Sequence, residues 1–435
     1  MFTFNKQDFG DFTFGAATAA YQIEGGQTEG QGMSIWDSFA ATGRNVAGQE
    51  TGEIACDHYN RWPEDLDLLK EAGFDAYRFS FAWPRILPQG TGAINQAGLD
   101  FYDRLIDGML ERNLKPFATL YHWDLPSTLQ DKGGWLNRDI ANWLADYAEL
   151  VYQKFGDRLA KIATINEPWC VSFLSHYLGV HAPGYRDLRA TARAMHHVLL
   201  AHGTTIERLR SLGAKDLGIV LNLEFAKGAT ESDEDKAAAD LWDSIYNKWF
   251  LGGVFKQNYP QNVMDVLEPY MPDNYQDDMP TIGTKLDWLG INYYTRSHMK
   301  HDASVPNFQI SSVPGPLEKT DLGWEIYPQG LTELLKRVAK DYTDLPLYVT
   351  ENGLADAELY DDQLRVKYYD QHYKAALQAK QEGVDLRGYF AWSLLDNYEW
   401  AEGYDKRFGM VHVDYETQKR TPKSSYRAFQ KLLKD

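Results

Sequence analysis

Two glutamates, Glu167 and Glu351, each end a short apolar run, and each has an asparagine as its neighbour. A pair of carboxyl groups can cleave a glycosidic bond: one protonates the leaving oxygen, and the other attacks the anomeric carbon or activates water. A separation of about 5–5.5 Å between the carboxyl groups gives retention of configuration, and roughly 6.5–9.5 Å gives inversion. The sequence does not give the separation of the two carboxyl groups, so both retention and inversion stay open. Either glutamate alone could equally be a surface charge or a helix-capping neighbour, but the pair at equivalent positions favours chemistry.

Further polar and aromatic side chains lie within most of the apolar runs or just beyond their ends. They are Gln22 and Glu24, Arg78, His122-Trp123-Asp124, Asn166, Asn292-Tyr293-Tyr294, and Trp392 with Glu399-Trp400. If these runs are parallel strands of one closed sheet, their carboxyl ends meet on one rim. The set offers carboxyl, amide, imidazole and indole groups. Arg78 taken alone could instead form a buried structural ion pair.

The same rim contains no closely spaced cysteines or histidines of the kind that bind a metal ion. Neither Gly-x-Gly-x-x-Gly nor a phosphate-binding Gly-x-x-x-x-Gly-Lys-Ser/Thr loop occurs in the chain. We therefore predict no metal and no cofactor. His196, His197 and His202 lie within a predicted helix, where we expect them to serve in packing.

Eight short apolar or β-rich runs supply the strands that would position these groups. They are 12–19, 76–83, 115–123, 162–166, 217–225, 288–295, 347–350 and 386–394. Apolar residues repeat every three to four positions between them, as in Trp143, Leu144, Tyr147, Val151 and Phe155, which predicts intervening helices. Strands that alternate with helices pair in parallel, and eight of them can close without leaving an edge.

The sequence therefore predicts a single (β/α)₈ TIM barrel over residues 1–435, with extended βα loops. The alternative, an open doubly wound sheet, would normally carry a glycine-rich phosphate loop after its first strand. Gly73 and Gly156 are expected to end helices. Residues 269–284 and 301–319 are the most irregular stretches, and we expect both to be long loops.

Composition and charge limit the range of partners. The net charge of −18 disfavours binding to nucleic acid or to anionic membrane surfaces. No stretch has the apolar length of a membrane span, and the two cysteines cannot form a disulfide framework. A cytoplasmic protein is the simplest expectation, and the choice between monomer and homo-oligomer stays open. Thirteen tryptophans and 27 tyrosines suit either a core or a sugar-binding surface.

Several motifs together resemble glycoside hydrolase family 1, in family order and over almost the whole chain. They are Phe14-Gly15-Ala16-Ala17-Thr18-Ala19-Ala20-Tyr21-Gln22, Arg78-Phe79-Ser80, Tyr121-His122-Trp123-Asp124, Thr164-Ile165-Asn166-Glu167-Pro168, Gly290-Ile291-Asn292-Tyr293-Tyr294, Thr350-Glu351-Asn352-Gly353 and Arg407-Phe408-Gly409. The resemblance implies a retaining β-glycosidase that acts on terminal non-reducing β-D-glycosyl residues of small β-glycosides and cello-oligosaccharides. Its expected substrates are β-glucosides, with β-galactosides or β-fucosides also open.

The resemblance also implies a role for each matching residue. Glu167 would be the acid/base, which requires a raised pKa, and Glu351 the nucleophile. Arg78, Asn292 and Tyr294 would support the nucleophile. The sugar-binding residues implied are Gln22, His122, Trp123, Asn166, Trp392, Glu399 and Trp400, with Trp324 on the aglycone side and Phe408 closing the site beneath the sugar. Plain packing is an equal alternative for Phe408, and nearly so for Trp324.

Glu399-Trp400 resembles the branch of the family that acts on unphosphorylated sugars, because an anionic Glu399 would repel a sugar phosphate. A 6-phospho-β-glycosidase and a transglycosylase on the same scaffold remain alternatives. A sugar-binding protein without catalysis would need the aromatic rim but not both glutamates.

Overall fold

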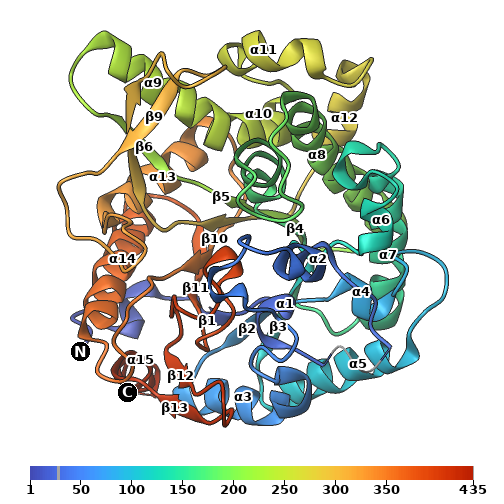
Figure 1. The fold of residues 1–435 in the computed structure, drawn as a ribbon. Coiled ribbons are helices and arrows are strands. Elements are labelled where there is room, and N and C mark those ends of the chain that lie inside the picture. The colour runs from blue at the N-terminus through green and yellow to red at the C-terminus, as the bar shows by residue number, and fades with distance from the viewer. Residues whose placement is uncertain (27–29, 435) are drawn as a thin grey trace.

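The computed structural model describes residues 1–26 and 30–434. Eight parallel strands form a closed barrel in the order β1-β11-β10-β7-β5-β4-β3-β2 (Figure 1). Their bounds are β1 (Thr13–Ala17), β2 (Ala76–Ser80), β3 (Lys115–Tyr121), β4 (Lys161–Asn166), β5 (Leu217–Asn222), β7 (Trp288–Asn292), β10 (Leu347–Asn352) and β11 (Leu386–Trp392). Each coincides with one of the eight predicted runs, so the predicted TIM barrel is confirmed.

Helices surround the barrel and cover the outer faces of its strands (Figure 1). The longer ones are α3 (His58–Ala72), α5 (Gln96–Glu111), α7 (Ile140–Phe155), α8 (Leu188–Ser211), α9 (Asp233–Asp243), α10 (Trp249–Lys256), α13 (Pro328–Asp341), α14 (Gln363–Gln381) and α15 (Ser424–Lys434). Shorter ones are α1 (Ala20–Ile23), α2 (Ile35–Ala41), α4 (Trp83–Ile86), α6 (Ser127–Gln130), α11 (Gln261–Leu267) and α12 (Met279–Ile282). Gly73 and Gly156 end α3 and α7 as predicted, and Gly73 has the left-handed φ of 87°.

Short helical turns and two small sheets complete the fold. The turns are η1 (Lys6–Phe9), η2 (Ala47–Gln49), η3 (Gly134–Leu136), η6 (Glu268–Tyr270), η7 (Tyr275–Asp278) and η8 (Trp400–Glu402), with wider π-type turns in η4 (Cys170–Leu178) and η5 (Ser244–Lys248). The sheets are β6 (Phe225–Gly228), β8 (Arg296–His301) and β9 (Ile310–Val313), and β12 (Val411–Val413) with β13 (Arg420–Pro422).

The prediction of two long irregular loops was therefore wrong in part. Residues 269–284 contain η7 and α12, and Asp278 there accepts hydrogen bonds from Arg138 and His196. Residues 301–319 contain β9, which pairs antiparallel with β8. The first stretch is ordered by contacts with segments distant in sequence and the second by pairing with the preceding strand, and local periodicity reveals neither.

Continuous burial marks the strands as barrel core, covered on both faces. Inside the barrel, the Phe117 ring lies 4.8 Å from Phe390 and 5.7 Å from Tyr348. His202 is buried on α8, with its Nδ1 2.7 Å from Thr164 Oγ1. Within the described residues, no three or more His, Cys, Asp or Glu side chains gather as metal ligands would. No helix in that part of the chain combines the length and apolarity that a membrane crossing requires.

Candidate active site

Glu351 lies in β10 and is held at both carboxylate oxygens. Arg78 Nη1, from β2, donates to Oε1 at 2.5 Å, and the Tyr294 hydroxyl donates to Oε2 at 2.7 Å. Arg78 is buried and also donates to the Thr350 carbonyl at 3.2 Å. A buried guanidinium on one oxygen and a phenol hydroxyl on the other fix the orientation of the Glu351 side chain.

Glu167 directly follows β4 and has a different environment. Asn292 Nδ2 donates to Oε1 at 2.6 Å, and the Cys170 thiol donates to Oε2 at 3.0 Å. Burial, and then the negative charge of Glu351, raise the pKa of Glu167 to about 8. The carboxyl group is therefore mainly protonated at neutral pH. Glu167 has a φ of 51°, a left-handed conformation that is rare without glycine and that often marks a functional site.

Asn292 was expected to support Glu351, but its side chain contacts the other carboxyl group. Its Nδ2 donates to Glu167 and, at 3.1 Å, to Asn166 Oδ1, while its Oδ1 accepts from Thr350 Oγ1 at 2.7 Å. The strand register places Asn292 beside Glu351. The direction of the side chain, which register does not determine, takes the amide across the barrel to Glu167.

Asn166 joins the environments of the two glutamates. Its Oδ1 accepts from Arg78 Nη2 at 2.7 Å and from Asn292, so its amide nitrogen faces His122 Nε2 at 3.1 Å. His122 Nε2 must then be the acceptor, and the ring proton lies on Nδ1. Burial lowers the pKa of His122, which keeps the ring neutral. Its Nδ1 is buried and has no hydrogen-bond partner among the described residues.

Both carboxyl groups open into one cavity of about 790 Å³. Of the residues predicted for the site, the following line it: Glu167, Glu351, Asn292, Tyr294, His122, Trp123, Trp324, Trp392, Glu399, Trp400 and Phe408. Three further predicted residues lie behind the lining residues and form hydrogen bonds with them: Arg78 with Glu351, Gln22 with Glu399, and Asn166 with His122. Glu24 pairs instead with Arg85 at 2.8 Å and takes no part in the lining.

Aromatic rings form one wall of the cavity. Trp123 and Trp400 lie 4.5 Å apart between centroids, and His122 stacks on Trp392 at 5.9 Å. The Trp123 indole N–H is taken by the Asn166 carbonyl at 2.9 Å, so this residue offers its ring face rather than a donor. Flat apolar faces of this kind suit the C–H surface of a sugar ring.

Gln22 and Glu399 meet at the far side of this wall. Gln22 Nε2 donates to the Tyr398 carbonyl at 2.8 Å and to Glu399 Oε2 at 3.4 Å, while its Oε1 is buried without a partner in the described chain. Burial, and then the charge of Glu351, raise the pKa of Glu399 to about 8. The negative charge on which the expected repulsion of phosphate rests is therefore largely absent at neutral pH, where this carboxyl group is mainly protonated.

The cavity is also lined by residues that were not predicted. They include Trp169, Cys170, Leu174, Val180, His181, Asn222, Leu223, Glu224, Trp242 and Tyr246. Glu224 accepts from Trp242 Nε1 at 2.7 Å, and burial raises its pKa to about 7. A signal for Glu224 was present, because it follows β5, the one strand whose carboxyl end received no polar residue in the prediction.

Comparison with known proteins agrees with this geometry. The family model described as Glycosyl hydrolase family 1 matches residues 5–435. Beta-glucosidase A of Thermotoga maritima is 47% identical over 434 residues, which is 98% of this chain and 97% of that protein. A beta-glucosidase of Agrobacterium sp. is 48% identical over 427 residues, 96% and 93% of the two chains.

Solved structures agree as well. The family 1 β-glucosidase from Thermotoga maritima superposes with a TM-score of 0.95 at 46% identity, covering 98% of this chain and 97% of that one. The same enzyme in complex with deoxynojirimycin also gives a TM-score of 0.95, at 47% identity and 98% coverage of both chains. A barrel with two carboxyl groups in one aromatic cavity, a family model over nearly the whole chain and relatives at this identity lead to one assignment: the chain belongs to glycosyl hydrolase family 1.

Proposed function

We propose that Glu167 and Glu351 hydrolyse the terminal non-reducing β-D-glucosyl residue of small β-glucosides by double displacement, with the whole chain 1–435 as one catalytic unit. The enzyme is a β-glucosidase-type glycosyl hydrolase. The observation that carries the division of roles is the contrast between the two carboxyl groups. Glu351 is fixed by Arg78 and Tyr294, whereas Glu167 is desolvated and has a pKa of about 8.

In the first step, a carboxylate oxygen of Glu351 attacks the anomeric carbon. The bond from that carbon to the leaving oxygen breaks, and this oxygen takes the proton of Glu167. The products of the step are a glucosyl ester on Glu351, ionised Glu167 and the free alcohol. The raised pKa of Glu167 supplies the protonated acid that the step requires.

In the second step, Glu167 acts as a base. Esterification removes the negative charge of Glu351, which is one cause of the raised pKa of Glu167. The pKa of Glu167 therefore falls, but its carboxylate can still accept a proton from water. The water oxygen attacks the anomeric carbon, the ester bond breaks, and Glu351 leaves as a carboxylate. The sugar keeps its β configuration after two inversions.

The glycone is held by donors and acceptors that face one end of the cavity. His122 Nδ1–H and Gln22 Oε1, both buried without protein partners in the described residues, are suited to sugar hydroxyls. Asn166 fixes the tautomer of His122, and the indoles of Trp392 and Trp400 cover the ring. Trp324 lies 6.2 Å from Phe408 and 5.6 Å from Tyr294, at the boundary towards the aglycone. No metal or cofactor enters this mechanism.

Relatives define the range of substrates to assay. They are named beta-glucosidase, 1,4-beta-D-glucan glucohydrolase and, in Bifidobacterium breve, bifunctional beta-D-glucosidase/beta-D-fucosidase. The panel should contain 4-nitrophenyl β-glucoside, β-fucoside and β-galactoside, cellobiose and 4-nitrophenyl β-glucoside 6-phosphate. We expect the unphosphorylated glucoside to be hydrolysed faster than its 6-phosphate, because the nearby Lys406 is already paired with Asp321 at 2.9 Å.

Two variants test the mechanism. Glu351→Gln should lose turnover of 4-nitrophenyl β-glucoside, and undiminished activity would overturn the assignment. Glu167→Ala should lower the rate roughly 10²–10⁴-fold for a substrate with a poor leaving group. Azide should restore its turnover of an aryl glucoside by yielding β-glucosyl azide. ¹H NMR of the first product of the wild type should show the β anomer, and an α anomer would exclude retention.

A further inference from the structure

Residues 397–408, named here the glycone loop, leave the end of β11 and return beside it. Five residues of this loop line the cavity: Glu399, Trp400, Ala401, Glu402 and Phe408. The segments on either side of the loop are joined by backbone hydrogen bonds. Ser393 N donates to the Phe408 carbonyl at 3.1 Å, and Asp396 N donates to the Val411 carbonyl at 2.9 Å. The placement of Glu399 therefore depends on what holds the loop closed.

The glycone loop is strained at the residue that faces the cavity. Trp400 has a φ of 49°, a left-handed conformation that is unfavourable for a residue with a side chain. Turn contacts within the loop support it, such as Glu399 N to the Gly403 carbonyl at 2.7 Å, and so does packing of the Trp400 ring against Trp123 and Trp36, at 4.5 and 4.7 Å between centroids. Strained backbone persists only where the surrounding structure over-determines it.

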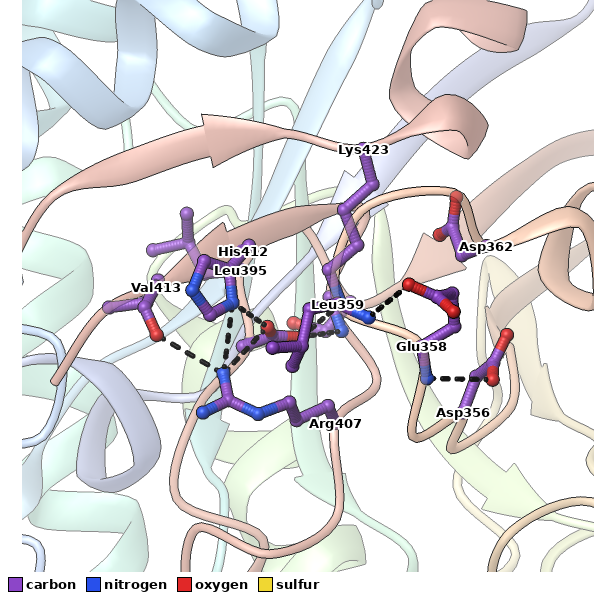
Figure 2. A network of polar contacts seen from close by, with 12 residues as sticks. Asp356, Glu358, Leu359, Asp362, Leu395, Arg407, His412, Val413 and Lys423 are labelled. Atoms are coloured by element: carbon purple, nitrogen blue, oxygen red, sulfur yellow. Dashed lines mark hydrogen bonds and ion pairs between the residues drawn. The ribbon is translucent and has the colours of Figure 1, made fainter.

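Asp396 lies at the base of this loop and is fully buried. Its Oδ1 accepts from Lys423 Nζ at 2.8 Å and from Gly409 N at 3.0 Å, and its Oδ2 accepts from Arg407 Nη1 at 2.9 Å. His412 Nδ1 lies 3.3 Å from Oδ2. Figure 2 shows the side chains of Arg407, His412 and Lys423 converging from separate segments. One carboxylate thus joins the start of the loop to its end and to the start of α15.

The charges around Asp396 make this a carboxylate site. Burial alone raises the pKa of Asp396, but the adjacent Lys423 and His412 outweigh burial and hold it at about 2. Arg365 and Asp362, themselves fully buried as an ion pair, lie beyond Lys423, and Arg365 donates to the Arg407 carbonyl at 2.7 Å. A buried charge with several donors is costly to disrupt and strongly orients its partners.

Gly409 permits the close approach that this site needs. A Cβ atom there would lie 1.9 Å from the Asp396 backbone nitrogen and 2.3 Å from the Leu395 carbonyl carbon. Only glycine lets the returning end of the loop reach the carboxylate. The contact at the base of the loop therefore depends on three residues: the buried Asp396, Gly409 opposite it, and Lys423, which lies 27 residues after Asp396.

We propose that Asp396 is a positioning residue for glycone recognition: by joining Arg407, Gly409 and Lys423 it closes the glycone loop and places Glu399 against the sugar hydroxyls. The inference rests on the proposed function and adds to it that Glu399, which lines the cavity beside Gln22, binds sugar hydroxyls, the 6-hydroxyl among them. Asp396 itself does not line the cavity, so it acts through Glu399 and Trp400.

The test compares two substrates that differ by one hydroxyl, 4-nitrophenyl β-glucoside and its 6-deoxy analogue. In the wild type, the ratio of their kcat/KM values measures recognition of the 6-hydroxyl. Asp396→Asn, Lys423→Met and Arg407→Gln each weaken the closure of the loop. We expect the ratio to fall about tenfold in Asp396→Asn, the scale of one hydrogen bond. Falls in the other two variants should be smaller, because Asp396 keeps its remaining donors.

Asp65→Asn is the matched control. Asp65 is also fully buried and accepts from His58 Nδ1 at 2.8 Å and from Arg420 Nε at 2.9 Å, but it contacts no residue of the glycone loop. This variant should lower the thermal midpoint and keep the wild-type ratio. If Asp396→Asn does not fold, the kcat/KM ratios of Lys423→Met and Arg407→Gln test the proposal. Arg407, with 18% of its side chain exposed, is the less buried of these two residues.

The outcomes separate the two proposals. A wild type without β-glucosidase activity would refute the proposed function. An active wild type whose ratio is retained in every folded loop-base variant, or is already near one, would refute the positioning role of Asp396. A fall of equal size in Asp65→Asn would also refute it, because the effect would then follow from stability alone.

Discussion

Glu167 and Glu351 are the same side chain in two electrostatic settings. Glu351 faces a buried guanidinium at 2.5 Å, and Glu167 faces an amide at 2.6 Å and a thiol at 3.0 Å. The charge of one carboxylate raises the pKa of the other, which is how neighbouring acids are driven into separate roles. The assignment of acid and nucleophile can therefore be tested through the titration of Glu167.

Replacing Glu351 by Gln should lower the pKa of Glu167. The substitution removes the negative charge that opposes ionisation, while Arg78, Asn292 and Cys170 continue to favour the ionised form. ¹³C NMR of protein labelled at the glutamate side-chain carboxyl carbon, compared between wild type and variant, measures this shift. A pKa of Glu167 that stays at its wild-type value or rises would contradict the coupling.

Replacing Asn292 by Ala should raise the pKa of Glu167, because the hydrogen bond from its amide favours the carboxylate. The alkaline limb of kcat/KM, along which activity falls as the acid loses its proton, should move to higher pH. The rate itself should fall about tenfold or more, since one charged hydrogen bond is lost. Cys170→Ala provides the comparison. It removes the thiol that donates to Glu167 Oε2, so the alkaline limb of kcat/KM should move to higher pH in this variant as well.

Among elements, the contact between β10 and β11 sets the position of Glu351. Gly353 follows β10, and a Cβ atom there would lie 1.7 Å from the Trp392 carbonyl oxygen at the end of β11. Only glycine allows these two strand ends, one carrying Glu351 and the other Trp392, to approach so closely.

Gly353→Ala should therefore destabilise the fold by about 1–3 kcal/mol or more, the usual cost of overpacking, and should strongly reduce turnover. Gly43→Ala is the control, because its Cβ atom would meet only the Gln49 side-chain nitrogen at 3.6 Å. Its unfolding free energy should stay within about 0.5 kcal/mol of the wild type. Urea unfolding of both variants makes the comparison, and equal stability would show that the strands can separate without cost.

At the scale of the whole molecule, buried ionisable groups predict how stability depends on pH. Burial lowers the pKa of several histidines from 6.5, so below that pH the unfolded chain binds protons that the folded chain does not. They are His122, His176, His181, His197, His202 and His372. Burial raises the pKa of fewer carboxyl groups, which hold protons in the folded chain only. They are Asp124, Glu167, Glu224 and Glu399.

The sign of the effect follows from which state binds more protons. Between about pH 4.5 and 6.5 the histidines outnumber the carboxyl groups, so the unfolding free energy rises with pH. From about pH 6.5 to 8 the unfolded histidines are neutral. The four carboxyl groups then outweigh Lys423, whose pKa burial lowers to about 8, so the unfolding free energy falls. The thermal midpoint should be highest near pH 6.5. A midpoint that continues to rise to pH 8 would contradict this balance.

The sequence by itself determined the eight strands, the helices between them and the rim on which Glu167 and Glu351 lie. Those features are local, because continuous apolar runs and a three-to-four-residue repeat specify buried strands and amphipathic helices wherever they occur. The same argument applies to Glu224, because it lies just after the end of β5, as other site residues lie at the ends of their strands.

Only the tertiary structure decided which groups touch. Arg78 and Glu351 are 273 residues apart in the chain, Asn292 turns to Glu167 rather than Glu351, and Glu399 becomes mainly protonated at neutral pH. Hydrogen-bond partners depend on side-chain direction, and the charge of an acid depends on the burial and charges around it. Both quantities arise only when distant segments pack together, and for that reason the division of roles within the cavity had to come from the folded chain.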